Sequence, residues 1–167
     1  RLQTIYVAPG NAGTAVEPRI RNVAITDLDE LAEFAVDEKI DLTVVGPELP
    51  LSLGIQDEFS KRGLPIFGPS RLAAQIESSK IFAKEFFRRH GIATSQAIVC
   101  GSRPDAEAAI RQLGFPCVLK ADGLAGGKGV LVVESRDEAD RAIGLFFQER
   151  VFGAGGELRR PVAAVQE

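Results

Sequence analysis

VLKADGLAGGKGVLVV, residues 118–133, contains two apolar runs separated by a glycine-rich segment. The apolar runs predict two strands and the glycines predict a tight loop, so the stretch predicts a β-hairpin. Glycines let backbone amides approach an anion closely, and Lys120 and Lys128 add positive charge. The pattern favours a loop that binds nucleotide phosphates, and a flexible surface hairpin is the alternative.

Two better-known phosphate-binding motifs do not fit this stretch. A P-loop requires glycine where Asp122 stands and Ser or Thr where Gly129 stands, and a helix follows it, whereas an apolar strand-like run follows here. A dinucleotide-binding fingerprint is excluded as well, because no Gly-x-Gly-x-x-Gly follows a predicted strand.

The composition is that of an ordinary globular protein, with 45% hydrophobic and 26% charged residues among 167. The net charge is −3 and no cluster of Lys and Arg indicates nucleic-acid binding. No signal peptide and no long apolar run is visible, so we expect no membrane association. Cys100 and Cys117 form no Cys-x-x-Cys pair, which predicts reduced thiols and a cytoplasmic location. The chain begins at Arg1 and ends directly after an apolar run, so we expect it to be part of a longer protein.

Short apolar runs alternate with amphipathic stretches along the first 70 residues, which predicts a parallel α/β unit. Ligands collect at the carboxyl ends of parallel strands, where the loop Pro9–Thr14 and Glu48 are expected. The predicted strands are 4–8, 23–25, 41–45 and 66–67, and the predicted helices follow Asp27 and extend over 51–62.

One long helix is predicted from Ser70 to His90, with Lys80 in the middle of its apolar stripe. A lysine in such a stripe either extends to the edge of the apolar surface or points into a cleft that holds an anion. His90 lies at the helix end, where it favours the dipole and needs no catalytic role. After this helix we predict strands at 97–100, 116–121, 130–133 and 162–165, with helices over 104–113 and after Ser135.

Five motifs occur in an order and spacing that resemble the phosphoribosylamine–glycine ligase family, also called glycinamide ribonucleotide synthetases, of the ATP-grasp superfamily. They are Val7–Thr14, Val45–Leu51, Phe67–Pro69, Glu77–Lys80 and Leu119–Val130. The resemblance implies an α/β fold in two parts. Residues 1–75 would form an N-terminal Rossmann-like, pre-ATP-grasp parallel-sheet unit that is incomplete at its start. Residues 76–167 would form the N-terminal part of an ATP-grasp domain, including its α+β lid subdomain.

The resemblance also implies an activity, the ATP-dependent ligation of glycine to 5-phosphoribosylamine through a glycyl phosphate. The products would be glycinamide ribonucleotide, ADP and phosphate, in de novo purine biosynthesis, with Mg²⁺ or Mn²⁺ as the metal. Another ATP-grasp carboxylate–amine ligase and a non-catalytic nucleotide-binding module are the alternatives. We expect this chain to be inactive alone, and nothing in the sequence indicates an oligomeric state.

By the same resemblance, two groups of residues are candidates for ligand binding. The metal ligands are expected beyond residue 167, and no catalytic residue is assigned within the chain. The ATP contacts would be Lys80, Lys120, Ala121, Asp122, Gly123, Leu124, Ala125, Gly126, Gly127, Lys128, Gly129 and Glu167. The contacts to the amine substrate would be Gly10, Asn11, Ala12, Gly13, Thr14, Pro47 and Glu48.

Overall fold

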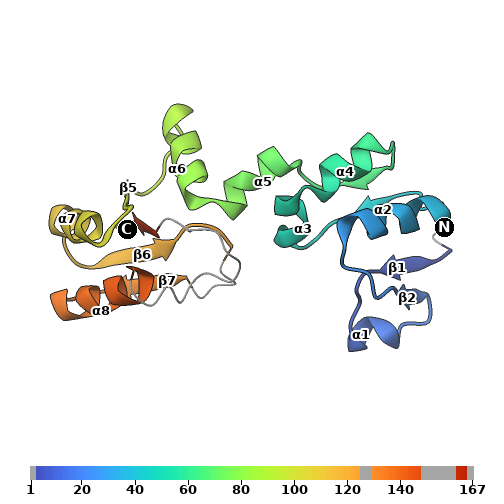
Figure 1. Ribbon diagram of the computed structural model, residues 1–167, viewed down its shortest axis with the longest axis horizontal. Helices are drawn as coiled ribbons and strands as arrows, with labels where there is room; N and C mark the ends of the chain where they lie inside the picture. The colour runs from blue at the N-terminus through green and yellow to red at the C-terminus, as the bar shows by residue number, and fades with distance from the viewer. Residues whose placement is uncertain (1–2, 125–128, 148–160, 165–167) are drawn as a thin grey trace. The chain divides into compact units, whose positions relative to one another are not determined.

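The chain forms two compact units in a computed structural model, Arg1–Leu72 and Ala73–Glu167 (Figure 1). The structure describes residues 3–124, 129–147 and 161–164, the last of these as backbone only. No helix among these residues has both the length and the apolar character needed to cross a bilayer.

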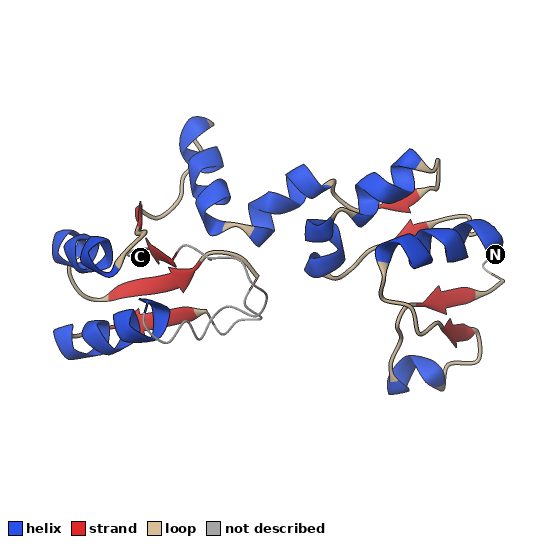
Figure 2. Ribbon diagram, viewed as in Figure 1, coloured by secondary structure: helices blue, strands red, loops and turns tan. Residues whose placement is uncertain are grey.

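The first unit contains two separate pairs of parallel strands (Figure 2). One pair aligns Ile5 with Ile20 and Val7 with Asn22, and the other aligns Thr43 with Ile66. The strands are β1 (Ile5–Val7), β2 (Ile20–Asn22), β3 (Thr43–Val44) and β4 (Ile66–Phe67). The helices are α1 (Ala12–Ala15), α2 (Leu28–Asp37), α3 (Glu48–Leu53) and α4 (Ile55–Lys61).

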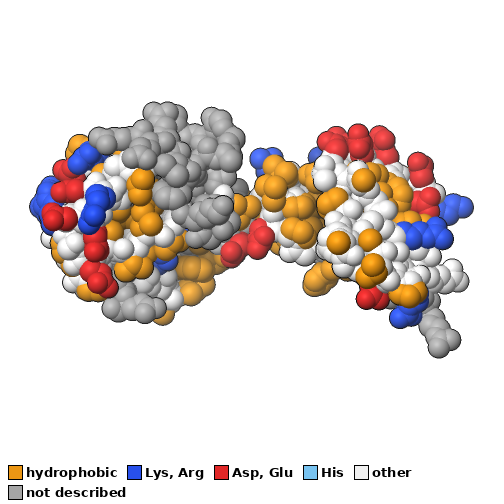
Figure 3. Space-filling view, turned by 90° about the horizontal axis from the view of Figure 1, so that it is seen from below, with side chains coloured by type: hydrophobic (Ala, Val, Ile, Leu, Met, Phe, Trp, Pro, Cys, Tyr) orange, Lys and Arg blue, Asp and Glu red, His pale blue; other side chains and the backbone are white. Residues whose placement is uncertain are grey.

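The core of this unit lies where α2 packs against α4. Phe59 is 1% exposed, and Ala32, Ala35 and Ile55 are also buried. Burial of one large side chain of this kind contributes about 1.5–3 kcal/mol. Other apolar side chains remain at the surface of this unit, as Figure 3 shows, and Phe67 on β4 is 70% exposed.

The second unit contains a mixed α and β arrangement around a four-stranded antiparallel sheet in the order β5-β8-β6-β7. Its strands are β5 (Ala97–Val99), β6 (Cys117–Ala121), β7 (Val130–Val133) and β8 (Pro161–Ala164). Its helices are α6 (Lys80–Arg89), α7 (Arg103–Leu113) and α8 (Arg136–Phe147), and α5 (Arg71–Ser78) leads into it.

The two faces of strand β6 differ in burial, and one of them belongs to the core of the second unit. Cys117, Leu119 and Ala121 are buried, whereas the intervening Val118 and Lys120 are only half-buried. Because side chains alternate along a strand, Lys120 points away from the face that carries Leu119. The core on Leu119's side is completed by α7 and α8, through residues such as Ala106, Ala109, Ile110, Ala139, Ala142 and Ile143.

Three expectations about the elements are wrong. The second strand lies at Ile20–Asn22 and not at 23–25, because the amide of Ile25 bonds to the carbonyl of Val23 at 2.8 Å and turns the chain. The helix expected over 51–62 divides at Gly54, whose φ of +100° is left-handed. The helix expected over 70–90 divides at Ser79, whose backbone is extended (φ −133°, ψ 114°).

Candidate functional site

The glycine-rich segment connects β6 to β7 as a hairpin, as predicted. Lys120 pairs with Val130 across the two strands, and the amide of Ala121 donates to the carbonyl of Gly129 at 2.8 Å. Lys120 is the second-last residue of β6, so only Ala121 separates it from the loop. Five of the expected ATP contacts lie outside the described residues: Ala125, Gly126, Gly127, Lys128 and Glu167.

Lys80 reaches this hairpin from the start of α6. The break at Ser79 makes Lys80 the first residue of a new helix, and its Nζ donates to the carbonyl oxygen of Gly123 at 3.1 Å. This contact joins positions 43 residues apart in the sequence and is partly buried. The Lys80 ammonium is therefore directed at the glycine-rich loop, and its contact with an anion stays a prediction.

Lys84, one helical turn after Lys80, is a further lysine near the hairpin that sequence reasoning did not identify. Its Nζ donates to Thr94 Oγ1 at 2.7 Å and to the carbonyl of Ser95 at 2.7 Å. Burial lowers the pKa of Lys84, and the neighbouring positive charge of Lys120 lowers it further. The four-residue spacing from Lys80 was the available signal, because such residues share one face of a helix.

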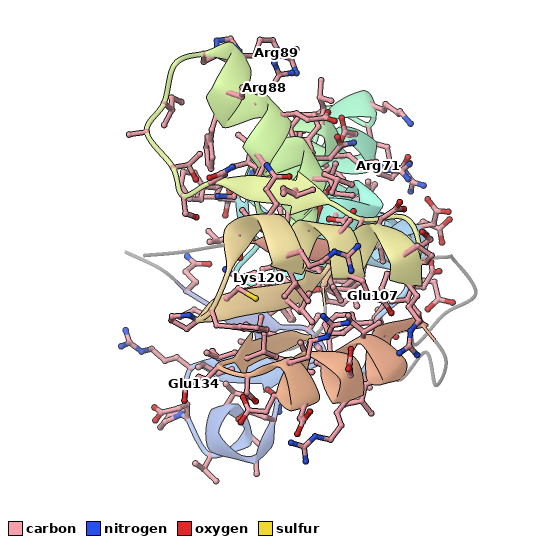
Figure 4. The ribbon with its side chains drawn as sticks, turned by 90° about the vertical axis from the view of Figure 1, so that its left-hand side faces the viewer. Arg71, Arg88, Arg89, Glu107, Lys120 and Glu134 are labelled. Atoms are coloured by element: carbon pink, nitrogen blue, oxygen red, sulfur yellow. The ribbon has the colours of Figure 1, made fainter. Side chains whose placement is uncertain are left out.

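Three of the described lysines are called the lysine cluster below. Lys120 lies on β6, Lys80 bonds to the carbonyl of Gly123 just after that strand, and Lys84 is close enough to Lys120 for their charges to interact. Positive charges brought close together repel one another, and an anion bound between them relieves that repulsion. Figure 4 shows Arg88 and Arg89 at the end of α6 that is remote from Lys120, so these arginines lie apart from the cluster. The arrangement suits an extended polyanion such as a nucleotide's phosphates.

Asp122, the first residue after β6, directs its carboxylate at the start of α6. Its oxygens accept hydrogen bonds from the hydroxyl of Ser79 at 3.1 Å and from the amide of Ile81 at 3.2 Å. The start of α6 is thus joined to two successive residues of the hairpin. The carboxylate of Asp122 accepts from the helix, and the carbonyl of Gly123 accepts from the ammonium of Lys80.

The turn 10–14 in the first unit is held by its own side chains and by Asn22. Asn11 accepts from the amides of Gly13 and Thr14 at 2.8 and 3.0 Å and so caps α1. Asn22 donates to the carbonyl of Asn11 at 2.9 Å and accepts from the hydroxyl of Thr14 at 2.7 Å. Gly10 has a φ of +78°, and its missing side chain leaves room for Asn22. Asn22 is a second residue that sequence reasoning missed, because the strand that carries it was placed three residues too late.

Glu48 is exposed and is the first residue of α3, with Pro47 as the N-cap. No hydrogen bond or ion pair within the described parts of the chain joins Glu48 to the turn 10–14. Figure 1 shows α1 and α3 apart from each other in this unit. Their expected cooperation in one substrate site therefore remains a prediction.

The sequence matches two domain models that belong to one enzyme family. The N domain of phosphoribosylglycinamide synthetase matches residues 1–77, and its ATP-grasp (A) domain matches residues 78–158. The chain belongs to the phosphoribosylglycinamide synthetase family. Similar curated members are phosphoribosylamine–glycine ligases from Ralstonia nicotianae, 51% identical over 156 residues, and from Escherichia coli K12, 50% identical over 157 residues. Each alignment covers 93% of this chain and 37% of the relative, so the chain spans little more than a third of these synthetases.

Solved structures agree with this membership. The phosphoribosylamine–glycine ligase of Thermotoga maritima has a TM-score of 0.71 at 28% identity, covering 98% of this chain and 38% of that structure. N5-carboxyaminoimidazole ribonucleotide synthetase from Thermus thermophilus has a TM-score of 0.62 at 20% identity, covering 87% and 36%, which shows a shared fold alone. The predicted family and the predicted fold class, an α/β unit followed by part of an ATP-grasp domain, are confirmed.

Proposed function

We propose that this chain supplies the phosphate-binding lysines and the hairpin of an ATP-dependent ligase that joins glycine to 5-phosphoribosylamine. The observation that carries the proposal is the gathering of Lys80, Lys84 and Lys120 at the glycine-rich hairpin of an ATP-grasp family member. Lys80 and Lys120 would contact ATP, together with the hairpin backbone at 121–124 and 129. The remaining loop residues and Glu167 belong to the same proposal on the sequence pattern alone.

The chemistry requires such a site because a carboxylate has no leaving group. Glycine's carboxylate oxygen would attack the γ-phosphorus of ATP, giving glycyl phosphate and ADP. The amine of phosphoribosylamine would then attack the acyl carbon, phosphate would leave, and the amine would lose a proton. Catalysis of phosphoryl transfer is mainly positioning and charge neutralisation, which fixed ammonium groups supply.

We propose that the amine substrate binds to the first unit. The turn 10–14 is a candidate because its backbone is fixed by Asn11 and Asn22 and because it follows the carboxyl end of β1. Glu48 and Pro47 are the other candidates, with Glu48 able to accept hydrogen bonds from ribose hydroxyls or from the amine.

We propose Mg²⁺ or Mn²⁺ as the metal that accompanies ATP, neutralising phosphate charge when it is bound. No group of three His, Cys, Asp or Glu side chains suited to a metal occurs among the described residues. The family resemblance is what places the metal ligands of the proposal beyond residue 167. A cytoplasmic location follows from the proposed role in purine synthesis, with ATP, glycine and phosphoribosylamine as the partners.

The test is an assay of the intact protein with ATP, Mg²⁺, glycine and freshly generated phosphoribosylamine. We expect ADP release that requires both glycine and the amine, and a product with the mass of glycinamide ribonucleotide. ADP release that is indifferent to glycine but requires another carboxylate would identify a different ATP-grasp ligase. ATP binding without any turnover would identify a nucleotide-binding module instead, and either outcome would contradict the proposal.

A further inference from the structure

Asp122 stands at the junction of β6 and the glycine-rich loop, and its side chain is engaged with a distant helix. Its Oδ1 accepts from Ser79 Oγ at 3.1 Å and from the Ile81 amide at 3.2 Å, and its Oδ2 lies 3.3 Å from the same hydroxyl. All of these contacts are partly buried. The Asp122 carboxylate is therefore already hydrogen-bonded to groups of the protein, the Ser79 hydroxyl and the Ile81 amide.

The start of α6 requires such an acceptor. The first amides of a helix have no partner within the helix. Ser79 accepts from the Phe82 amide at 3.1 Å, which satisfies one of them, and Asp122 satisfies the Ile81 amide. A negative charge at this end also complements the helix dipole. One helix end is thus capped jointly by its own N-cap residue and by a residue of the hairpin.

Helix α6 also donates a hydrogen bond to the hairpin, at the residue that follows Asp122. Lys80, between Ser79 and Ile81, donates to the carbonyl of Gly123, the neighbour of Asp122. Together, these contacts fix Asp122 and Gly123, the first two residues after β6, relative to the helix that carries Lys80 and Lys84. A carboxylate accepts hydrogen bonds but donates none, and its charge repels phosphate, so Asp122 is poorly suited to bind phosphate oxygens directly.

We propose that Asp122 is a positioning residue that fastens the start of the glycine-rich loop to α6. It thereby holds Lys80 and Lys120 in one arrangement for the same phosphate chain. This role rests on the proposed function in that it assumes ATP phosphates as the ligand. The contact itself is present without any ligand, and it can be measured without one.

The contact is tested first in the intact protein without nucleotide, by hydrogen exchange of the Ile81 amide. Asp122→Ala removes the only acceptor that the Ile81 amide has among the described residues. We therefore expect this amide to exchange about tenfold faster than in the wild type. Asp122→Asn keeps an oxygen that can accept, and Ser79→Ala leaves the carboxylate in place, so both should exchange more slowly than Asp122→Ala. Asp137→Asn is the matched control, because Asp137 is an exposed acidic residue of α8 and should leave Ile81 unchanged.

ATP titrations at several Mg²⁺ concentrations then separate positioning from direct binding. We expect about 5- to 30-fold weaker ATP binding for Asp122→Ala, less than about threefold for Asp122→Asn, and the same Mg²⁺ dependence in all variants. Equal losses for both substitutions, with a raised Mg²⁺ requirement, would overturn the proposal in favour of direct contact with the metal nucleotide. Unchanged Ile81 exchange with normal ATP binding would overturn the positioning role alone. A wild type that binds no ATP would refute the proposed function, and the exchange data would still show whether Asp122 caps α6.

Discussion

Substitution of Gly10 has a cost that can be worked out from the structure. A Cβ at this position would lie 2.2 Å from Asn22 Cγ, and the φ of +78° is left-handed. The backbone conformation costs alanine about 1–2 kcal/mol. Asn22 must also move and give up its hydrogen bonds with Asn11 and Thr14, at about 0.5–1.5 kcal/mol each. We expect Gly10→Ala to lower the free energy of unfolding of the first unit by about 2–5 kcal/mol.

Gly63→Ala is the matched control for Gly10→Ala. Gly63 has a similar φ of +70° in the same unit, but a Cβ there meets nothing within 4 Å, so only the backbone cost of about 1–2 kcal/mol applies. Tyr6 on β1 is the only tyrosine, and the chain has no tryptophan. Urea unfolding followed by near-ultraviolet circular dichroism therefore reports on this unit. Equal losses for the two variants would refute the steric reasoning.

Two further predictions concern titrating side chains. Cys100 and Cys117 are 1% and 2% exposed, and burial raises the pKa of the Cys117 thiol. A thiol reagent at neutral pH should therefore modify both cysteines only after denaturation. Rapid modification of the native protein would contradict this prediction. The hydrogen bond that Tyr6 donates to Glu38 at 2.6 Å raises the pKa of Tyr6, and burial adds to the effect. Its stabilising effect is therefore complete below the ordinary pKa of 10.0 and is lost as the pH rises through the raised value. Melting temperatures between about pH 9 and 12 should fall less steeply for Tyr6→Phe than for the wild type, and parallel curves would show that the bond is absent.

Features set by local sequence were predictable. A helix was expected to follow Asp27, and Asp27 caps α2 by accepting from the amides of Asp29 and Glu30 at 2.9 and 3.1 Å. The hairpin of β6 and β7 was likewise expected, because two apolar runs joined by glycines have few alternatives. In both cases the decisive residues lie within a few positions of one another.

Features set by distant partners were not predictable in the same way. The helical pattern continues through Ser79, yet the helix divides there because Ser79 and Asp122 together cap a new helix. Asn22 escaped notice because its importance comes from the turn at Gly10 and Asn11, to which β1 and β2 bring it. Such contacts join residues that periodicity treats separately, so they appear only once the chain is folded.

Calorimetric titration of the intact protein with ATP and Mg²⁺ tests the central claim most directly, by comparing the wild type with Lys120→Ala. Arg88→Ala is the control, since Arg88 lies at the far end of α6 (Figure 4). Loss of a charge-assisted contact of roughly 1.5–3 kcal/mol predicts about 10- to 150-fold weaker binding for Lys120→Ala. The control should bind ATP as the wild type does. Unchanged ATP affinity in Lys120→Ala would contradict the assignment of the lysine cluster to the nucleotide phosphates.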